Sequence, residues 1–434
     1  MHYLPNILFA ILLIIGIGFF IKNIKKLIRN IKLGKSVDRS DNSSLRLKNM
    51  INIALGQSKM VRRPIAGLLH IIVYVGFIII NIEVLEIIID GLFGTHRVFS
   101  SLGGFYGFLI GSFEILAFLV FISVVVFWIR RMLLRIPRFW NKEMKGFPKN
   151  DALYILYFEM VLMTLFIVMN ATDTHFQEAN SGNVISQFIA PLFDGASIAS
   201  LHLIERAAWW IHITGILIFL NYLYYSKHLH ILLAFPNTYY ANLNPKGKFD
   251  NLESVTKEVQ LMLDPNADPF ATPAETETDE VPEKFGAEDA TDLNWVQLLN
   301  AYTCTECGRC TSVCPANQTG KELSPRAIMM KTRDRVEAIG KNIDKNGQFV
   351  DDGKTLLDTI SMEEIWACTS CNACVEECPV NIDPLSIIMD MRRFQVMEKS
   401  AAPQELNIMM TNIENNGAPW QYNQQDRLNW KDEE

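Results

Sequence analysis

Cysteine is absent from the first 303 of the 434 residues, and all eight cysteines lie between Cys304 and Cys378. Eight cysteines in so long a chain do not make a small disulfide-stapled fold. The sequence also has no glycine-rich loop of the G-x-G-x-x-G or Walker type, so it offers no standard phosphate-binding loop. With 49% hydrophobic residues it is too apolar for a disordered chain. The chemistry of this chain must therefore depend on other groups.

Charge is distributed unevenly along the chain. The net charge of −7 combines about +9 in residues 1–244 with about −16 in residues 245–434. The basic residues cluster beside apolar segments, and the half without such segments is acidic. This pattern argues against a nucleic-acid-binding protein. It indicates two parts of different character on one chain.

The basic half contains five apolar stretches, each long enough to cross ~30 Å of hydrocarbon. The first has no basic residues before it and no small-residue cleavage site, so we interpret it as a retained span and not a signal peptide. Buried core helices of a soluble protein are the alternative, which five such runs make unattractive. The predicted spans are residues 5–21, 64–89, 102–129, 152–170 and 207–225.

The loops between the spans differ in positive charge. Residues 22–63 carry 12 Lys and Arg and residues 130–150 carry 7, whereas residues 90–101 hold one and residues 171–205 none. The positive-inside rule then places the N-terminus outside an inner (cytoplasmic) membrane and everything after about residue 226 in the cytoplasm. Because the cytoplasm is reducing, we expect the cysteines to be metal ligands and not disulfides.

The cysteines form two matching C-x2-C-x2-C-x3-C-P strings. In this spacing three thiolates bind one [4Fe–4S] cluster and the fourth cysteine turns to the other cluster. Zinc sites usually show two C-x2-C pairs with a long gap, so zinc fits less well. The predicted ligand sets are Cys304, Cys307, Cys310 and Cys378 for one cluster and Cys368, Cys371, Cys374 and Cys314 for the other.

A helix start follows each string, because Ser324-Pro325 and Asp383-Pro384 combine an N-cap residue with proline at the first helical position. The strings lie 64 residues apart, which favours a helical ferredoxin arrangement over a small-sheet one. The predicted fold is all-α, a five-helix transmembrane bundle followed by an α-helical ferredoxin domain. We expect a haem b-type membrane domain at 1–240, an acidic linker at 241–292 with a short helix near 251–263, the two-cluster domain at 293–400, and a C-terminal tail at 401–434 that contacts a partner.

Histidines in the membrane half are candidate haem ligands, since polar groups at membrane depth are costly. On one continuous helix His230 follows His212 by five whole turns, so both would share a face about 27 Å apart. His70 then pairs with His230 or, by depth, with His228. A second haem at His212 would need His96, His175 or His202 as its partner, or is absent. The alternative is that these are ordinary buried or interfacial histidines.

Carboxylates at membrane depth also need an explanation. Glu159 lies at a depth similar to that of His70 and could relay protons to a quinone. The alternative is a neutral acid in a helix-to-helix hydrogen bond, which applies equally to Glu83, Glu86 and Glu114.

Residues 301–310 (AYTCTECGRC), the two cysteine strings and residues 415–420 (NNGAPW) resemble heterodisulfide-reductase-type iron–sulfur oxidoreductases. Residues 62–70 (RRPIAGLLH) and 226–230 (SKHLH) are similar to the five-span haem b domain of nitrate reductase gamma subunits. The resemblance implies electron donors such as reduced electron-transferring flavoprotein or a hydroxy-acid dehydrogenase. Fused relatives continue into a Cys-Cys-Gly domain, which we expect here on a partner chain.

These features predict a membrane-bound electron-transfer subunit. It would pass electrons between a cytoplasmic Cys-Cys-Gly or flavoprotein partner and the menaquinone or quinone pool, through two [4Fe–4S] clusters and one or two b haems. The same carriers could run in reverse, from quinol to a disulfide. Alternatives of other classes are a haem-free membrane ferredoxin for oxidase assembly or metal reduction, and a structural anchor for a dehydrogenase.

Overall fold

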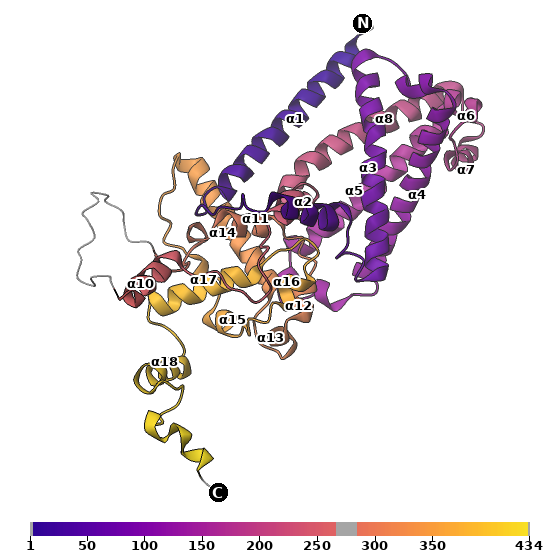
Figure 1. Ribbon diagram of the computed structural model, residues 1–434. Helices are drawn as coiled ribbons and strands as arrows, with labels where there is room; N and C mark the ends of the chain where they lie inside the picture. The colour runs from indigo at the N-terminus through magenta and orange to yellow at the C-terminus, as the bar shows by residue number, and fades with distance from the viewer. Residues whose placement is uncertain (1–2, 266–283, 433–434) are drawn as a thin grey trace.

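The computed structural model describes residues 3–265 and 284–432, and these are helical with no β-strand. A bundle of long helices forms one end of the molecule, and a layer of shorter helices packs against it (Figure 1). The only pairing of strand type in the described ranges is an isolated bridge between Lys35 and Asn294. The all-α fold predicted from the sequence is confirmed.

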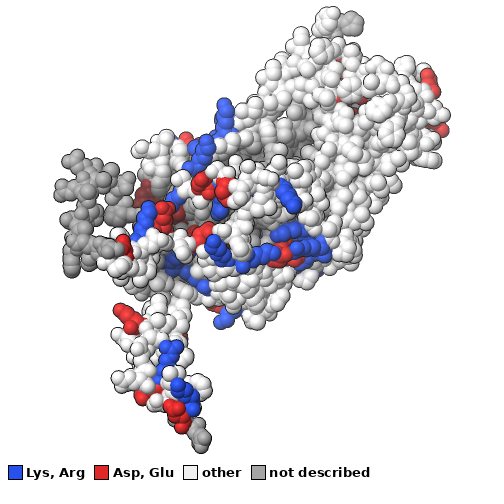
Figure 2. Space-filling view, viewed as in Figure 1, with Lys and Arg blue, Asp and Glu red and all other residues white. Residues whose placement is uncertain are grey.

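Within the described residues, five helices are long and apolar enough to cross a membrane. Helix α5 packs between α4 and α8, α3 packs on α4, and α1 packs on both α3 and α8. The exposed face of this bundle is almost free of charged side chains, which gather on the other half and at the junction (Figure 2). The five helices are α1 (Leu4–Ile31), α3 (Pro64–Phe93), α4 (Gly104–Met132), α5 (Phe147–Thr172) and α8 (Ile198–Tyr222).

The helix of the fifth span ends before His228 and His230. Helix α8 ends at Tyr222, and the extended residue Ser226 separates the short turns η6 (Leu223–Tyr225) and η7 (Lys227–Leu229). Helix α9 (His230–Tyr239) starts only after this break. The prediction that His212 and His230 share a face of one helix is therefore wrong, because the break resets the helical phase.

Short helices connect the spans. On the side of the iron–sulfur half, α2 and η1 lie between the bundle and the helical layer below it (Figure 1). The connecting elements are α2 (Ser43–Met50), η1 (Ile51–Leu55), η2 (Val98–Leu102), η3 (Pro137–Phe139), η4 (Lys142–Met144), α6 (Thr174–Ala179), α7 (Ser186–Ile189) and η5 (Ala190–Phe193).

The cysteine-containing half is built from short helices around two longer ones. The predicted helix starts are confirmed, since Ser324 and Asp383 accept hydrogen bonds from the backbone N–H groups of Ala327 and Ser386. Its elements are η8 (Ala290–Asp292), α11 (Trp295–Thr303), α12 (Arg309–Val313), α13 (Pro315–Gln318), α14 (Pro325–Asn346), η9 (Leu356–Asp358), α15 (Met362–Trp366), α16 (Ala373–Glu377), α17 (Pro384–Met397), α18 (Gln404–Asn416) and η10 (Gln424–Lys431).

The hydrophobic core of the iron–sulfur half extends into the membrane half. Leu27 of α1 and Leu229 of η7 are buried in the same cluster as the core of the iron–sulfur half. Asn30 donates to the Tyr302 hydroxyl at 3.0 Å. A Cβ on Gly34 would lie 2.7 Å from the backbone of Asn294, so only glycine permits this close approach. The end of α1 is thus a structural part of the iron–sulfur half.

The predicted linker is only partly a connector. Its expected short helix is present as α10 (Glu253–Leu263), and the acidic Thr- and Pro-rich run from 272 to 282 lies outside the described residues. Ala287 and Ala290 already belong to the iron–sulfur core. We therefore propose that this domain starts near residue 284 and not at 293.

Candidate metal centres

Each cysteine string folds into a loop followed by one short helix, and the two loops follow the same backbone course. Glu306 and Gly308 have φ of 53° and 70°, and Ser370 and Asn372 at the matching positions have 56° and 58°. Left-handed residues at these points bend the chain tightly. The repeat in the sequence is therefore repeated in the backbone, which positions the intervening cysteines alike.

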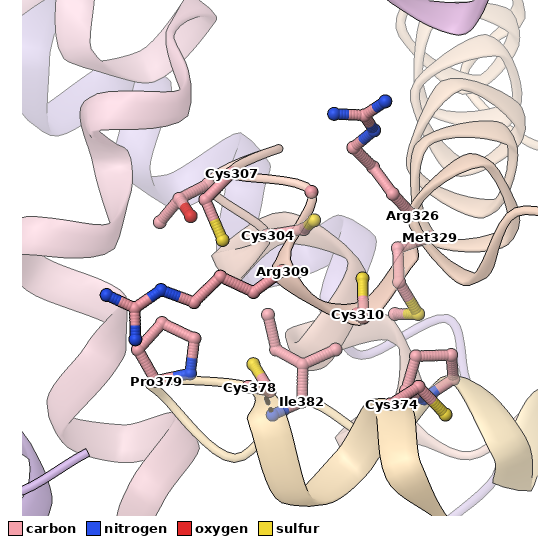
Figure 3. Close-up of a pocket in the computed structure, with 13 residues that line it drawn as sticks. Cys304, Cys307, Arg309, Cys310, Arg326, Met329, Cys374, Cys378, Pro379 and Ile382 are labelled. Atoms are coloured by element: carbon pink, nitrogen blue, oxygen red, sulfur yellow. Dashed lines mark hydrogen bonds between the residues drawn. The ribbon is translucent and has the colours of Figure 1, made fainter. Parts of the chain in front are cut away.

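Two cavities lie among the cysteines. The first, here called the membrane-side cavity, has as its sulfur lining Cys304, Cys307, Cys310, Cys374 and Cys378. The second, the distal cavity, has Cys314, Cys368, Cys371 and Cys374. Figure 3 shows the sulfur of Cys374 to one side of the membrane-side cavity. Apart from Cys374, which borders both, each cavity gathers cysteines of one string with the last cysteine of the other. We propose the two crossed sets as the cluster ligands.

The chemistry of the donors fits iron–sulfur clusters. All eight thiols are free. Burial raises the pKa of the Cys304 thiol to about 12 and that of Cys378 to about 11, so metal binding must displace their protons. The Cys378 sulfur accepts a hydrogen bond from the Ile382 N–H at 3.3 Å, a contact of the kind that tunes cluster potentials. No three His, Cys, Asp or Glu side chains in the described ranges gather around a single-ion site.

The membrane-side cavity lies against the membrane half. Arg309 from its wall donates to the backbone carbonyls of Lys59 and Met60 at 3.1 and 3.3 Å. Arg326, fully buried in the same wall, donates to Glu143 at 2.7 Å. The distal cavity is lined only by residues from 314 onward. The membrane-side cavity is therefore the one in contact with the membrane half, whereas the distal cavity is bordered by the exposed Cys371.

Differences between the two loops coincide with contacts to the membrane half. Glu306 stands where the other loop has Ser370, and Arg309 stands where it has Ala373. Both charged residues bind groups of the membrane half, whereas their counterparts do not. Sequence analysis did not single out either residue. An alignment of the two cysteine strings, which shows the positions where they differ, would have identified Glu306 and Arg309.

Glu306 is buried between two cations. It pairs with Lys227 of η7 and, at 2.8 Å, with Arg333 of α14. Burial alone would raise the pKa of Glu306, but Lys227 and Arg333 together lower it, so its carboxylate is charged. This ion triad joins the first cysteine loop to the chain break after α8.

His70 and His230 meet at the end of the bundle that faces the membrane-side cavity. Their ring centroids are 6.4 Å apart and the rings are inclined by 37°. His230 Nδ1 lies 3.0 Å from the Lys227 carbonyl oxygen. Because a carbonyl can only accept, Nδ1 carries the proton and Nε2 is the nitrogen left for a metal.

The spacing of these rings fits one iron between them. A metal–imidazole bond is about 2.0–2.1 Å and the nitrogen lies about 1.1 Å from its ring centre, so opposed imidazoles have centroids roughly 6.3 Å apart. The observed 6.4 Å agrees with that value, as does the spacing of His96 and His175, so the distance permits an iron without identifying one. The buried Nδ1 of His70 has no hydrogen-bond partner among the described residues. We propose that His70 and His230 would hold a b haem.

The His228 side chain makes a different contact. Its Nε2 lies 3.4 Å from Glu159, and its ring is inclined by 76° to that of His230 at a centroid distance of 5.4 Å. Glu159 thus stands beside His228, whose ring contacts that of His230. The geometry favours His228 as a partner of Glu159 over His228 as an iron ligand.

His212 is buried but stands apart from the other histidines. Its ring contacts Phe166 at 6.3 Å, and its Nδ1 has no partner in the described structure. His96 and His175 contact each other instead, with centroids 6.4 Å apart, and His96 pairs with Asp173. His202 is largely exposed and lies 3.8 Å from Glu205. No histidine that the structure describes meets His212, so a second haem there finds no axial pair.

Comparison with known proteins supports the iron–sulfur assignment. Residues 303–382 match the model of the 4Fe-4S dicluster domain. The chain is 28% identical over 98% of its length to the probable iron–sulfur-binding oxidoreductase FadF of Bacillus subtilis, covering 61% of that protein. It is 24% identical over 98% of its length to the EtfAB:quinone oxidoreductase of Syntrophomonas wolfei, covering 59%.

Part of the chain matches other proteins. Over 35% of its length it is 33% identical to a probable membrane-anchored ferredoxin of Chromohalobacter salexigens, covering 25% of that protein. Heterodisulfide reductase subunits C also match in part, which agrees with the resemblance predicted from the cysteine strings. The chain spans about three fifths of the length of the two relatives that match it throughout. No solved structure matches it.

Proposed function

We propose that this chain is the membrane-bound electron-transfer part of an oxidoreductase that connects a soluble partner with the quinone pool. The observation that carries the proposal is spatial order. The exposed Cys371 borders the distal cavity, the membrane-side cavity contacts Lys59 and Met60 just before α3, and α3 carries His70 of the His70–His230 pair. Two [4Fe–4S] clusters and one b haem would supply one-electron carriers along this line.

The residues of the chain would position the clusters and the haem, surround them with protein, and supply groups that exchange protons. The crossed cysteine sets would hold the clusters, and His70 and His230 would hold the haem. Glu159, paired with His228 at the edge of the bundle, is the carboxylate we propose to exchange protons with a quinone. Its half-buried position, 17% exposed, suits a group that must contact both a lipid-soluble substrate and water.

The proposed orientation places the N-terminus outside the cytoplasmic membrane and the iron–sulfur half in the cytoplasm. The basic loops that predict this orientation lie on the same side as the cysteines. Arg62 and Arg63 pair with Glu376 and Glu377 at the end of α16, which ties one basic loop to the iron–sulfur half. Five crossings are consistent with termini on opposite sides.

The proposed soluble partner is a flavoprotein or a Cys-Cys-Gly-domain protein. The name of the Syntrophomonas relative pairs a flavoprotein donor with quinone, which supports the first choice. Cys371 at the distal cavity offers the point of closest access. The C-terminal tail, with α18 projecting away from the domain (Figure 1), is the proposed partner contact.

The test is the cofactor content of anaerobically purified full-length protein. We expect about eight irons in clusters per chain, cubane EPR signals after reduction, and one b haem by the pyridine haemochrome method. Re-oxidation of the reduced protein by a menaquinone analogue should follow. Protein with clusters but no haem would instead favour a haem-free membrane ferredoxin, the second candidate, which the match to a probable membrane-anchored ferredoxin supports.

A further inference from the structure

The two cysteine loops share a backbone but differ in one buried side chain. The residue before the second cysteine is Ser370 in one loop and Glu306 in the other, and both have a positive φ. Serine adopts the loop conformation without a carboxylate, so the loop itself does not require Glu306. Yet Glu306 is only 3% exposed, and a buried charge is costly unless it is paired. Its partners therefore indicate its role.

Glu306 reaches out of its loop to Lys227 in the chain break after α8. The carbonyl of the same lysine accepts the hydrogen bond from His230 Nδ1 at 3.0 Å. A short path of bonded and hydrogen-bonded atoms thus runs from the Cys304–Cys307 loop to the imidazole of His230. This is the orienting contact that metal-binding histidines require.

Lys227 is held from the other side as well. Its backbone N–H donates to Asp151 at 3.1 Å, and Asp151 also accepts from the Tyr222 hydroxyl at 2.7 Å. Arg333 at 2.8 Å from Glu306 completes the cluster and anchors it to α14. Both partners of the ion pair are therefore held in place, Lys227 by the membrane bundle and Glu306 by the iron–sulfur half.

We propose that the Lys227–Glu306 ion pair is a positioning device, which orients the His230 imidazole and sets its spacing from the first cysteine loop. The inference rests on the proposed function for the identity of the groups that are spaced. The contact itself, and its mechanical effect, belong to the chain alone. Neither residue would touch a substrate, so both act through His230 and the cysteine loop.

The test compares substitutions in the full-length protein. Lys227→Met and Glu306→Ser remove the pair, and the second installs the residue of the sister loop, so its backbone is tolerated. Lys227→Arg restores a cation. The matched control is Lys331→Met, which breaks the 2.7 Å pair with Glu364 inside the iron–sulfur half.

Three measurements follow these variants. Hydrogen–deuterium exchange reports protection of residues 223–234 and 303–314, EPR reports the haem and cluster spectra, and flash photoreduction with deazaflavin reports the rate at which haem is reduced after the clusters. For Lys227→Met and Glu306→Ser we expect loss of protection in both segments, an altered haem spectrum at unchanged iron content, and haem reduction slowed about 10–100-fold. Lys227→Arg should recover and Lys331→Met should match wild type.

Wild-type exchange, spectrum and rate in Lys227→Met and Glu306→Ser would overturn the proposal. Loss of protection in Lys331→Met to the same extent would also overturn it, because the effect would then be a general loss of stability. A wild-type protein without haem would refute the proposed function and not this inference. The exchange measurement needs no haem and would still decide it.

Discussion

The His70–His230 pair leads to the most direct prediction. Replacing either residue with alanine should remove the b haem, whereas His228→Ala should leave it in place. The three histidines lie within one small region, so the comparison tests geometry and not general damage. His228 is two residues from His230 in the chain and 5.4 Å from it between ring centroids.

The expected size of the effect follows from the site. The 6.4 Å between the His70 and His230 centroids matches the roughly 6.3 Å that two opposed imidazoles require. Changes in outer-shell partners already alter metal affinity about 10–100-fold, so loss of a ligand should lower haem per chain at least ~10-fold. The His228 nitrogen is engaged by Glu159 at 3.4 Å, so its removal costs no iron ligand.

The assay is haem per chain by the pyridine haemochrome method, with non-haem iron measured on the same sample. Unchanged non-haem iron shows that the iron–sulfur half is still folded. Haem retained in His230→Ala but lost in His228→Ala would refute the geometric argument and make His228 the ligand. Haem retained in both His70→Ala and His230→Ala would refute the site altogether.

Three further predictions follow. Because ligation is crossed, Cys314→Ser should abolish the cluster held by Cys368, Cys371 and Cys374, and Cys378→Ser should abolish the membrane-side cluster. Each variant should lose roughly half of the iron per chain. Loss of the cluster of the substituted string in either variant would contradict crossed ligation. Arg326→Ala leaves the 18% exposed Glu143 without its cation, at a cost of about 1–3 kcal/mol, so the denaturant midpoint for cluster loss should fall. An unchanged midpoint would count against a role for this pair in docking. In protein stripped of iron, Cys304 should be alkylated slowly at neutral pH and faster as the pH rises toward 12, because burial raises its pKa to about 12. Mass spectrometry measures the extent of alkylation. Fast alkylation at pH 7 would contradict the prediction.

The sequence located the spans well but not their full lengths. Residues 198–206 begin the fifth helix, yet Ser200, His202, Glu205 and Arg206 interrupt its apolar pattern, so the predicted span starts only at 207. Similarly, α1 continues to Ile31 through basic residues that hydropathy assigns to a loop. Hydropathy detects the lipid-facing length of a helix and not the part that packs on a soluble domain.

The histidine site shows where reasoning along one chain segment fails. The sequence suggested His230 through a continuous helix, and that premise is wrong, because Ser226 breaks the helix. Ser226 caps the next turn by accepting from the His228 N–H at 3.1 Å. A serine just after an apolar run is a weak signal for such a break, since serine is also tolerated inside membrane helices. His70 and His230 nevertheless come together.

The sequence alone was enough to predict the features that depend on neighbours within a few residues. These features are the two C-x2-C-x2-C-x3-C-P strings, the Ser324 and Asp383 helix starts and the apolar runs. Tertiary structure alone decided which groups from distant segments meet. It placed His230 opposite His70 and Glu306 beside Lys227, because these contacts depend on how a broken helix and a cysteine loop pack against each other. No spacing along the chain encodes that packing.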